Sequence, residues 1–157
     1  MAALFALTAC GGPKSEVRPE EAVNFGSYRR IGVTAFVDRS GKGQAIADAI
    51  DAIFQREMYE PIDQKALALV LAKYKPDREL GYGIEALEMI RSQSGADALI
   101  LGRMAPDWSA ASVTMAETST GAPILHALLR PHGRKKKAFA TPEEVAQEFD
   151  RVFAKLR

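Results

Sequence analysis

Two stretches of the chain, residues 30–37 and 96–104, are apolar on both sides of a period-two pattern. A strand with apolar residues on both sides is typical of a sheet whose two faces are covered. We therefore predict that both stretches are central strands of one sheet. Their apolar side chains should organise the core, above all Ile31, Val33, Val37, Leu99 and Leu101.

Helical spacing of apolar residues occurs in four stretches: residues 44–58, 63–75, 84–95 and 141–156. Asp63 is expected to cap the second helix, and Gly95 to end the third in the left-handed conformation. Thr141 is followed by Pro142 and, three residues after the threonine, by Glu144. This combination predicts a capping box with proline in the first helical position.

Shorter strands are expected at residues 59–63, 111–118 and 124–130. Pro61 cannot donate to a strand ladder, so the first of these should lie at or near an edge. Gly121 ends a tight turn that predicts an antiparallel meander of the last three strands. The predicted order is β-α-β-α-α-β-β-β-α, an α/β fold with a mixed sheet in a two-layer or three-layer sandwich.

The first ten residues are typical of a lipoprotein signal sequence. Leu7, Thr8, Ala9 and Cys10 match the bacterial lipobox, in which the cysteine is acylated. Residues 1–9 are interpreted as a truncated signal segment, because no basic residue precedes the apolar stretch. Cys10 and the proline- and charge-rich segment up to residue 27 are predicted to be an acylated anchor and a flexible tether. Residues 28–157 would then form a single α/β domain.

The composition excludes several classes of function. The 157 residues carry a net charge of +1, which argues against nucleic acid as a partner. The single cysteine excludes an internal disulfide and a cysteine-rich metal site. The chain has no apolar run long enough to cross a membrane. Attachment to a membrane is therefore expected only through a lipid on Cys10.

Three segments resemble the CsgG-like superfamily of bacterial lipoproteins. They are IGVTAFVDRSG at residues 31–41, GADALILG at 95–102 and TSTGAPIL at 118–125. The superfamily includes the curli-secretion lipoprotein and the lipoprotein activator of penicillin-binding proteins, and the N-terminal domain of TolB shares its fold. The resemblance implies a periplasmic α/β domain. If the host is Gram-negative, Gly11 after the cysteine implies the periplasmic face of the outer membrane.

Candidate chemistry is sparse. Residues 40–43 read Ser-Gly-Lys-Gly, but the positions flanking them do not complete a phosphate-binding loop. His126 and His132 have no further ligand at metal-binding spacing, and Asp48 and Asp51 are typical of the solvated side of a helix. We predict no catalytic residues, no metal and no cofactor, and hence no enzyme.

Two features are candidates for recognition. The basic loop, residues 131–139, is dense in cations and follows Arg130. It is interpreted either as a solvated connection or as a contact for an anionic surface or acidic partner. Trp108 is the only tryptophan, interpreted either as a packing residue at a strand end or as an exposed anchor. The candidate surface comprises Trp108, Arg130, Arg134, Lys135, Lys136 and Lys137.

These observations predict a membrane-anchored periplasmic lipoprotein that acts as a non-enzymatic protein-interaction module. The processes expected are cell-envelope assembly, secretion or regulation of peptidoglycan synthesis, with an envelope protein as partner and with a homo-oligomer as a further possibility. The alternative is a periplasmic domain that binds a small ligand near the turn from Asp38 to Gly43, residues 38–43, here named the 38–43 turn.

Overall fold

The computed structural model describes residues 14–20, 24–57, 59–60, 62–75, 81–133 and 135–156. Five strands, four α-helices and two short 3-10 helices are assigned within these residues. In chain order they are β1 (Glu16–Pro19), η1 (Phe25–Ser27), β2 (Ile31–Val33), α1 (Gly43–Arg56), α2 (Gln64–Lys73), α3 (Ile84–Ser94), β3 (Ala98–Met104), β4 (Ala111–Glu117), β5 (Pro123–Leu129), α4 (Pro142–Phe153) and η2 (Ala154–Leu156). The predicted α/β class is confirmed.

The strands form one mixed sheet in the order β1-β5-β4-β3-β2. The predicted meander is confirmed, because β3, β4 and β5 pair antiparallel with their chain neighbours. β2 runs parallel to β3, with Gly32 opposite Leu99. The chain therefore begins its main domain with a parallel crossover and ends it with hairpins, as the sequence predicts.

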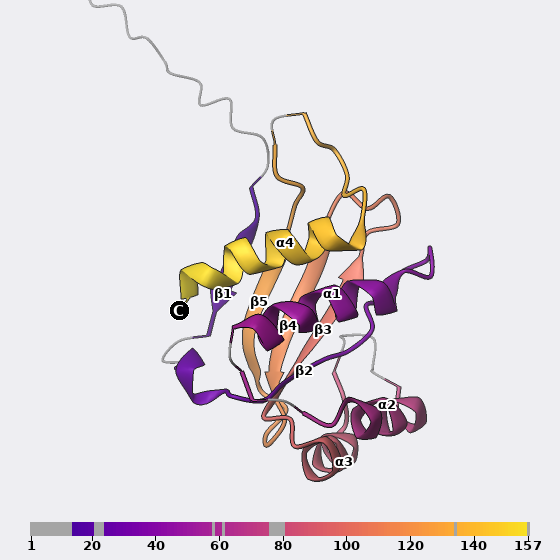
Figure 1. The fold of residues 1–157 in the computed structure, drawn as a ribbon, viewed down its shortest axis with the longest axis vertical. Helices are drawn as coiled ribbons and strands as arrows, with labels where there is room; N and C mark the ends of the chain where they lie inside the picture. Colours follow the sequence, from indigo (N-terminus) through magenta and orange to yellow (C-terminus); the bar gives the residue numbers. More distant parts are fainter. Residues whose placement is uncertain are drawn as a thin grey trace, which may run out of the picture.

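Helices cover the sheet unequally (Figure 1). α1 and α4 pack together on one face, against alternate residues of β3 such as Ile100. α2 and α3 pack on the other face, against Leu99 and Leu101 of the same strand. Beyond β3 that second face carries Thr114 and His126, whose side chains hydrogen-bond to each other at an exposed position. The sandwich thus has three layers over β2 and β3 and two layers over β4 and β5.

The predicted helix ends are largely confirmed. Asp63 accepts a hydrogen bond from the Ala66 amide at 2.9 Å, and Gly95 ends α3 with φ of 77°. Thr141 caps α4, and Glu144 reaches back to the Ala140 amide, one residue earlier than in a standard capping box. One helix prediction is wrong. The apolar spacing of residues 84–95 predicts that Ile84 faces inward with Leu87 and Ile90, but Ile84 is the first residue of α3 and is 54% exposed.

The first predicted strand is not central. β2 is one of the two edge strands of the sheet. The segment expected to pair beside it forms no strand at the described residues 59–60 and 62–63. The backbone amide of Glu60 donates to the Arg29 carbonyl, and the backbone amide of Asp63 donates to the Ser94 carbonyl. This segment therefore crosses the end of the sheet toward α3 instead of running along β2. β2 is nevertheless buried, because α1 covers one of its faces and α2 the other.

The alternation of residues 30–37 breaks after Val33. The Thr34 amide bonds to the Ile100 carbonyl and the Val37 amide to the Gly102 carbonyl, so three steps on this segment oppose two on β3. One extra residue reverses which side chains point inward. Phe36 is therefore buried and lies against Gly102, where a side chain would overlap its ring. The prediction that Val37 belongs to the core is wrong, because Val37 is 43% exposed.

Part of the predicted tether belongs to the sheet. Glu16–Pro19 forms β1, which pairs antiparallel with β5, and Val17 packs against the core. The meander leaves one edge of β5 free, and an extended segment that precedes the domain satisfies its backbone groups. Local composition does not reveal this pairing, because the other residues of β1 are largely exposed. The expectation of a flexible tether throughout residues 10–27 is thus wrong for β1.

Candidate functional site

The 38–43 turn and Trp108 form one hydrogen-bonded unit. The Asp38 carboxylate accepts hydrogen bonds from the indole nitrogen of Trp108 at 3.0 Å and from the Lys42 amide at 2.9 Å. The Ser40 hydroxyl donates to the same carboxylate. The Lys42 ammonium lies 5.2 Å from the centroid of the indole ring, a cation–π distance. The polar groups of the turn therefore bond to one another and to Trp108, and the indole ring is covered by Lys42.

Trp108 also holds the base of the basic loop. Its backbone has a φ of 59°, unusual for a residue other than glycine, and its carbonyl accepts a hydrogen bond from the Phe139 amide at 2.9 Å. The side chain of Phe139 is buried in the core. Trp108 is thus a partly buried residue that joins the β3–β4 turn to two other loops. Of its two interpretations, packing at a strand end fits these contacts.

The electrostatics of Asp38 indicate a structural carboxylate. Burial alone would raise the pKa of Asp38, but the hydrogen bonds from Ser40, Lys42 and Trp108 outweigh it and lower the pKa below its ordinary value. Its carboxylate bonds to the Lys42 amide at the N-terminus of α1. A helix N-terminus attracts anions, and here a side chain of the protein supplies the negative charge.

A cleft of about 550 Å³ lies between α1 and α2, beyond the exposed edge of residues 33–37. Its walls combine apolar side chains with a row of polar ones contributed by α1 and α2. None of the residues of the 38–43 turn lines it. The polar lining residues are Thr34, Gln44, Asp48, Asp51, Gln64 and Tyr82.

The pKa of Asp51, on the wall of the cleft, is raised above its ordinary value. Burial and, to a smaller extent, the charge of Asp48 raise the pKa of Asp51, although Gln55 and Gln64 each donate a hydrogen bond to it. Asp48 accepts a hydrogen bond from Gln44 at 2.8 Å. Each carboxylate thus has a side-chain amide partner from the protein itself.

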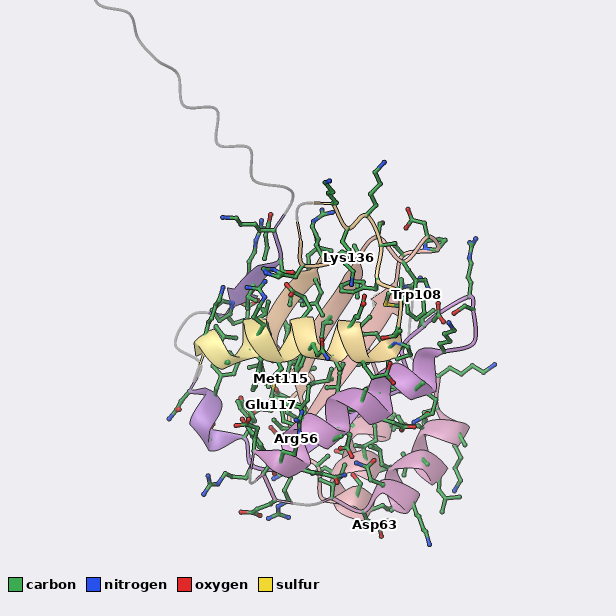
Figure 2. All side chains as sticks on the ribbon, turned by 45° about the horizontal axis from the view of Figure 1, so that its top comes forward. Arg56, Asp63, Trp108, Met115, Glu117 and Lys136 are labelled. Atoms are coloured by element: carbon green, nitrogen blue, oxygen red, sulfur yellow. The ribbon has the colours of Figure 1, made fainter. Side chains whose placement is uncertain are left out.

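The basic loop presents most of its charges to solvent. Lys135, Lys136 and Lys137 are exposed, and Arg130 is partly buried. Lys136 forms an ion pair with Glu144 at 2.5 Å. Figure 2 shows Lys136 and Trp108 toward the same end of the molecule, far from Asp63. The structure therefore brings the two predicted recognition features together, although only the lysines face outward.

A polar cluster behind the basic loop fastens β1 to the domain. The Arg130 amide donates to the Ser15 hydroxyl at 2.8 Å, and that hydroxyl donates to the Glu148 carboxylate. Glu148 is only 4% exposed and pairs with Arg151. Burial alone would raise its pKa, but the bonds from Arg151 and Ser15 outweigh burial and lower the pKa below 4.5.

Sequence reasoning did not identify Ser15 and Glu148. One signal for Glu148 exists in the helical spacing. Glu148 lies three residues after Val145 and four before Val152, on the apolar face of α4, where a carboxylate needs partners. No comparable signal marks Ser15, because its partners are 115 and 133 residues away in the chain.

Two predicted site residues, Cys10 and Arg134, lie outside the described residues. Within the described part of the chain, no group of three or more histidine, cysteine, aspartate or glutamate residues is placed to hold a metal ion. No helix of that part has the length and apolar character required to cross a bilayer.

The fold defines the chain as an α/β sandwich with a mixed five-stranded sheet. No protein-family model matches it, and no curated protein matches it. Among solved structures it is similar to a point variant of the PelC dodecamer from Paraburkholderia phytofirmans in space group C2. The TM-score is 0.54 at 12% identity, covering 89% of this chain and 96% of that one.

A second PelC dodecamer from the same organism, in space group P6, aligns with a TM-score of 0.47 at 15% identity, over 90% of this chain and 96% of that one. At 12% identity the first likeness shows a shared fold. The resemblance to the CsgG-like superfamily remains a prediction.

Proposed function

We propose that this protein is a lipid-anchored, non-enzymatic assembly module of the bacterial cell envelope, acylated on Cys10 at the periplasmic face of the outer membrane. It acts through self-association and an envelope partner, in assembly, secretion or the regulation of peptidoglycan synthesis. The observation that carries the proposal is the fold shared over 89% of the chain with a protein crystallised as a dodecamer. The lipobox and the resemblance to CsgG-like lipoproteins add support.

The edges of the sheet favour head-to-tail association. β1 and β2 are the outermost strands, and they differ in sequence, length and surroundings. Head-to-tail contact between two different surfaces generates rings when the rotation closes. β1 offers an exposed strand, while the edge beyond β2 borders the cleft between α1 and α2. A ring built from these two edges explains why neither needs a further covering element.

Acylation is tested first. The full chain, expressed in its native host, should be found in the membrane fraction with the mass of a lipidated Cys10 after removal of the residues before it. The Cys10→Ser variant should be found in the soluble fraction. Recovery of the unmodified thiol from soluble protein contradicts the anchor.

Self-association is tested by native mass spectrometry of the purified protein. Ala68 is exposed on α2 and lines the cleft, so Ala68→Arg places a bulky cation there without disturbing the helix. Ala52→Arg is the matched control, because Ala52 is exposed on α1 but does not line the cleft. We expect a high-order assembly that Ala68→Arg reduces and Ala52→Arg retains. A strictly monomeric wild type contradicts self-association.

A second function, binding of a small ligand, is favoured by the size of the cleft. Its 550 Å³ lies within the range of small-molecule sites, and its mixed lining is typical of them. The site would lie beside the 38–43 turn and not in it. Protein purified from its host and then denatured should release a compound detectable by mass spectrometry, absent from Ala68→Arg. Identical, empty spectra for both proteins contradict this function.

A further inference from the structure

The pairing of β1 shortens the connection between the anchor and the folded domain. If residues 10–27 were free, the domain could move far from the membrane. Because Ser15 bonds to Arg130 and β1 is part of the sheet, the chain is held against the domain from Ser15 onward. Lys14 lies four positions after Cys10, so the two residues can be at most about 14 Å apart. An acylated Cys10 would therefore hold this end of the domain close to the bilayer.

The end held in this way is the one with the basic loop. In Figure 1 residues 14–15, directly before β1, and the coloured part of the loop between β5 and α4 lie at the same end of the molecule, and α2 and α3 lie toward the other. The hydrogen bond from the Arg130 amide to the Ser15 hydroxyl, 2.8 Å long, fixes this proximity. Ser15, where the chain joins the domain, thus lies at the same end of the molecule as the basic loop.

The charges at this end are mostly uncompensated. Lys14, Lys135 and Lys137 are exposed and form no ion pair among the described residues. Two of the nearby acids are already engaged, and Glu143 beside them is exposed. Glu144 pairs with Lys136, and Glu148 is buried against Arg151. The result is a cationic end on a chain whose net charge is +1.

We propose that the basic loop is a docking surface for the anionic phospholipid headgroups of the membrane that carries the anchor, and that it sets the orientation of the domain. The inference rests on the proposed acylation of Cys10. A lysine within a Debye length of an anionic surface strengthens binding about fivefold, and the Debye length is about 8 Å at physiological salt. The short connection allows the loop to come within that range, so the anchor and the lysines can act on one membrane.

The first experiment measures the headgroup contribution without the lipid. Full-length Cys10→Ser protein is mixed with phosphatidylcholine vesicles of which about a third of the lipid is anionic phosphatidylglycerol, and with vesicles of phosphatidylcholine alone. Lys135→Gln/Lys137→Gln removes two loop charges. Lys65→Gln/Lys73→Gln removes two exposed charges from α2, and it is the matched control.

We expect the loop variant to lose about 25-fold in affinity for the anionic vesicles, and the α2 variant to lose less than about threefold. Phosphatidylcholine vesicles measure any contribution of the apolar residues 1–9, and rising salt should weaken only the anionic binding. Equal losses for both variants overturn the proposal. So does full competition by millimolar inorganic phosphate at constant ionic strength, which would indicate a free-phosphate site.

The second experiment reads the orientation. Cys10→Ser removes the only cysteine, so single labels can be placed at Ala140→Cys, beside the loop, and at Leu69→Cys, exposed on α2. Headgroup-attached quenchers should quench the first label several-fold more than the second. Equal quenching overturns the proposal. Because both experiments use unacylated protein, their failure is distinguishable from an absence of lipid on Cys10.

Discussion

The 38–43 turn and the basic loop are both polar, both contain glycine and both lie near Trp108. They differ in the partners that their charged side chains have. In the turn, Asp38 accepts hydrogen bonds from three groups, and Lys42 lies over the indole ring. In the loop, Lys135 and Lys137 have no ion-pair partner among the described residues.

The difference shows how to separate structure from recognition in a polar loop. A group whose hydrogen-bonding capacity is filled from within has little left for a partner. Exposed like charges repel one another, and the folded domain derives nothing from gathering them. We therefore expect damage to the turn to lower stability, and damage to the loop to lower binding while stability stays nearly unchanged.

The largest effect is expected from the support that both regions share. Leu99 belongs to β3, and its side chain is fully buried where α2 and α3 pack on the sheet. Leu99→Ala should lower the free energy of unfolding by about 2–5 kcal/mol, because it leaves a cavity. Denaturant titration checks this. Leu69→Ala is the control, since Leu69 is 67% exposed and should change stability by less than about 0.5 kcal/mol.

Glu148 tests the internally satisfied part of the loop region. Glu148→Ala should cost about 2–4 kcal/mol in chemical unfolding, because it leaves Arg151 and Ser15 without their shared acceptor. A loss as small as that of an exposed glutamate such as Glu143 would show that the cluster does not fasten β1.

The same residue makes stability depend on pH. The folded-state pKa of Glu148 lies below its ordinary value of 4.5, so its stabilising contribution is complete above that pH. The contribution is lost as pH falls through the folded-state pKa. Thermal unfolding between pH 6 and about pH 3 should therefore show a smaller loss of stability in Glu148→Gln than in wild type. Parallel curves would mean that other carboxylates dominate.

Asp38 tests the turn, with a smaller expected effect. Asp38→Ala removes the acceptor for Trp108 and Lys42 at a partly exposed site, and should cost about 1–3 kcal/mol. Trp108→Phe isolates the indole hydrogen bond and should cost about 1 kcal/mol less than Asp38→Ala. Heat denaturation of both variants measures the two losses of stability. Unchanged stability in Asp38→Ala would mean that the wild-type carboxylate does not stabilise the turn and is available to a ligand.

The smallest effect on stability is expected from the lysines. Lys135→Gln/Lys137→Gln should change the free energy of unfolding by less than about 0.5 kcal/mol, because both side chains are exposed and unpaired. Denaturant titration beside Asp38→Ala gives the comparison directly. A loss above about 1 kcal/mol would mean that the lysines support the fold, and the contrast between the two regions would then fail.

Local sequence determined much of this protein. The apolar stripes of α1 and α4, the caps at Asp63 and Thr141, and the meander of β3 to β5 depend on residues within a few positions of each other. Such short-range signals are present in the chain itself, because helix periodicity, capping and turn chemistry act over one or two turns.

Only the tertiary structure decided the order of the strands, the reversal of Phe36 and Val37, and the place of β1. Each depends on partners far away in the chain: β3 for the extra residue before Val37, and β5 for β1. The same holds for Ser15, whose partners lie more than a hundred residues away. Long-range pairing is set by the competition of whole surfaces for burial and backbone hydrogen bonds, which no local stretch of sequence encodes.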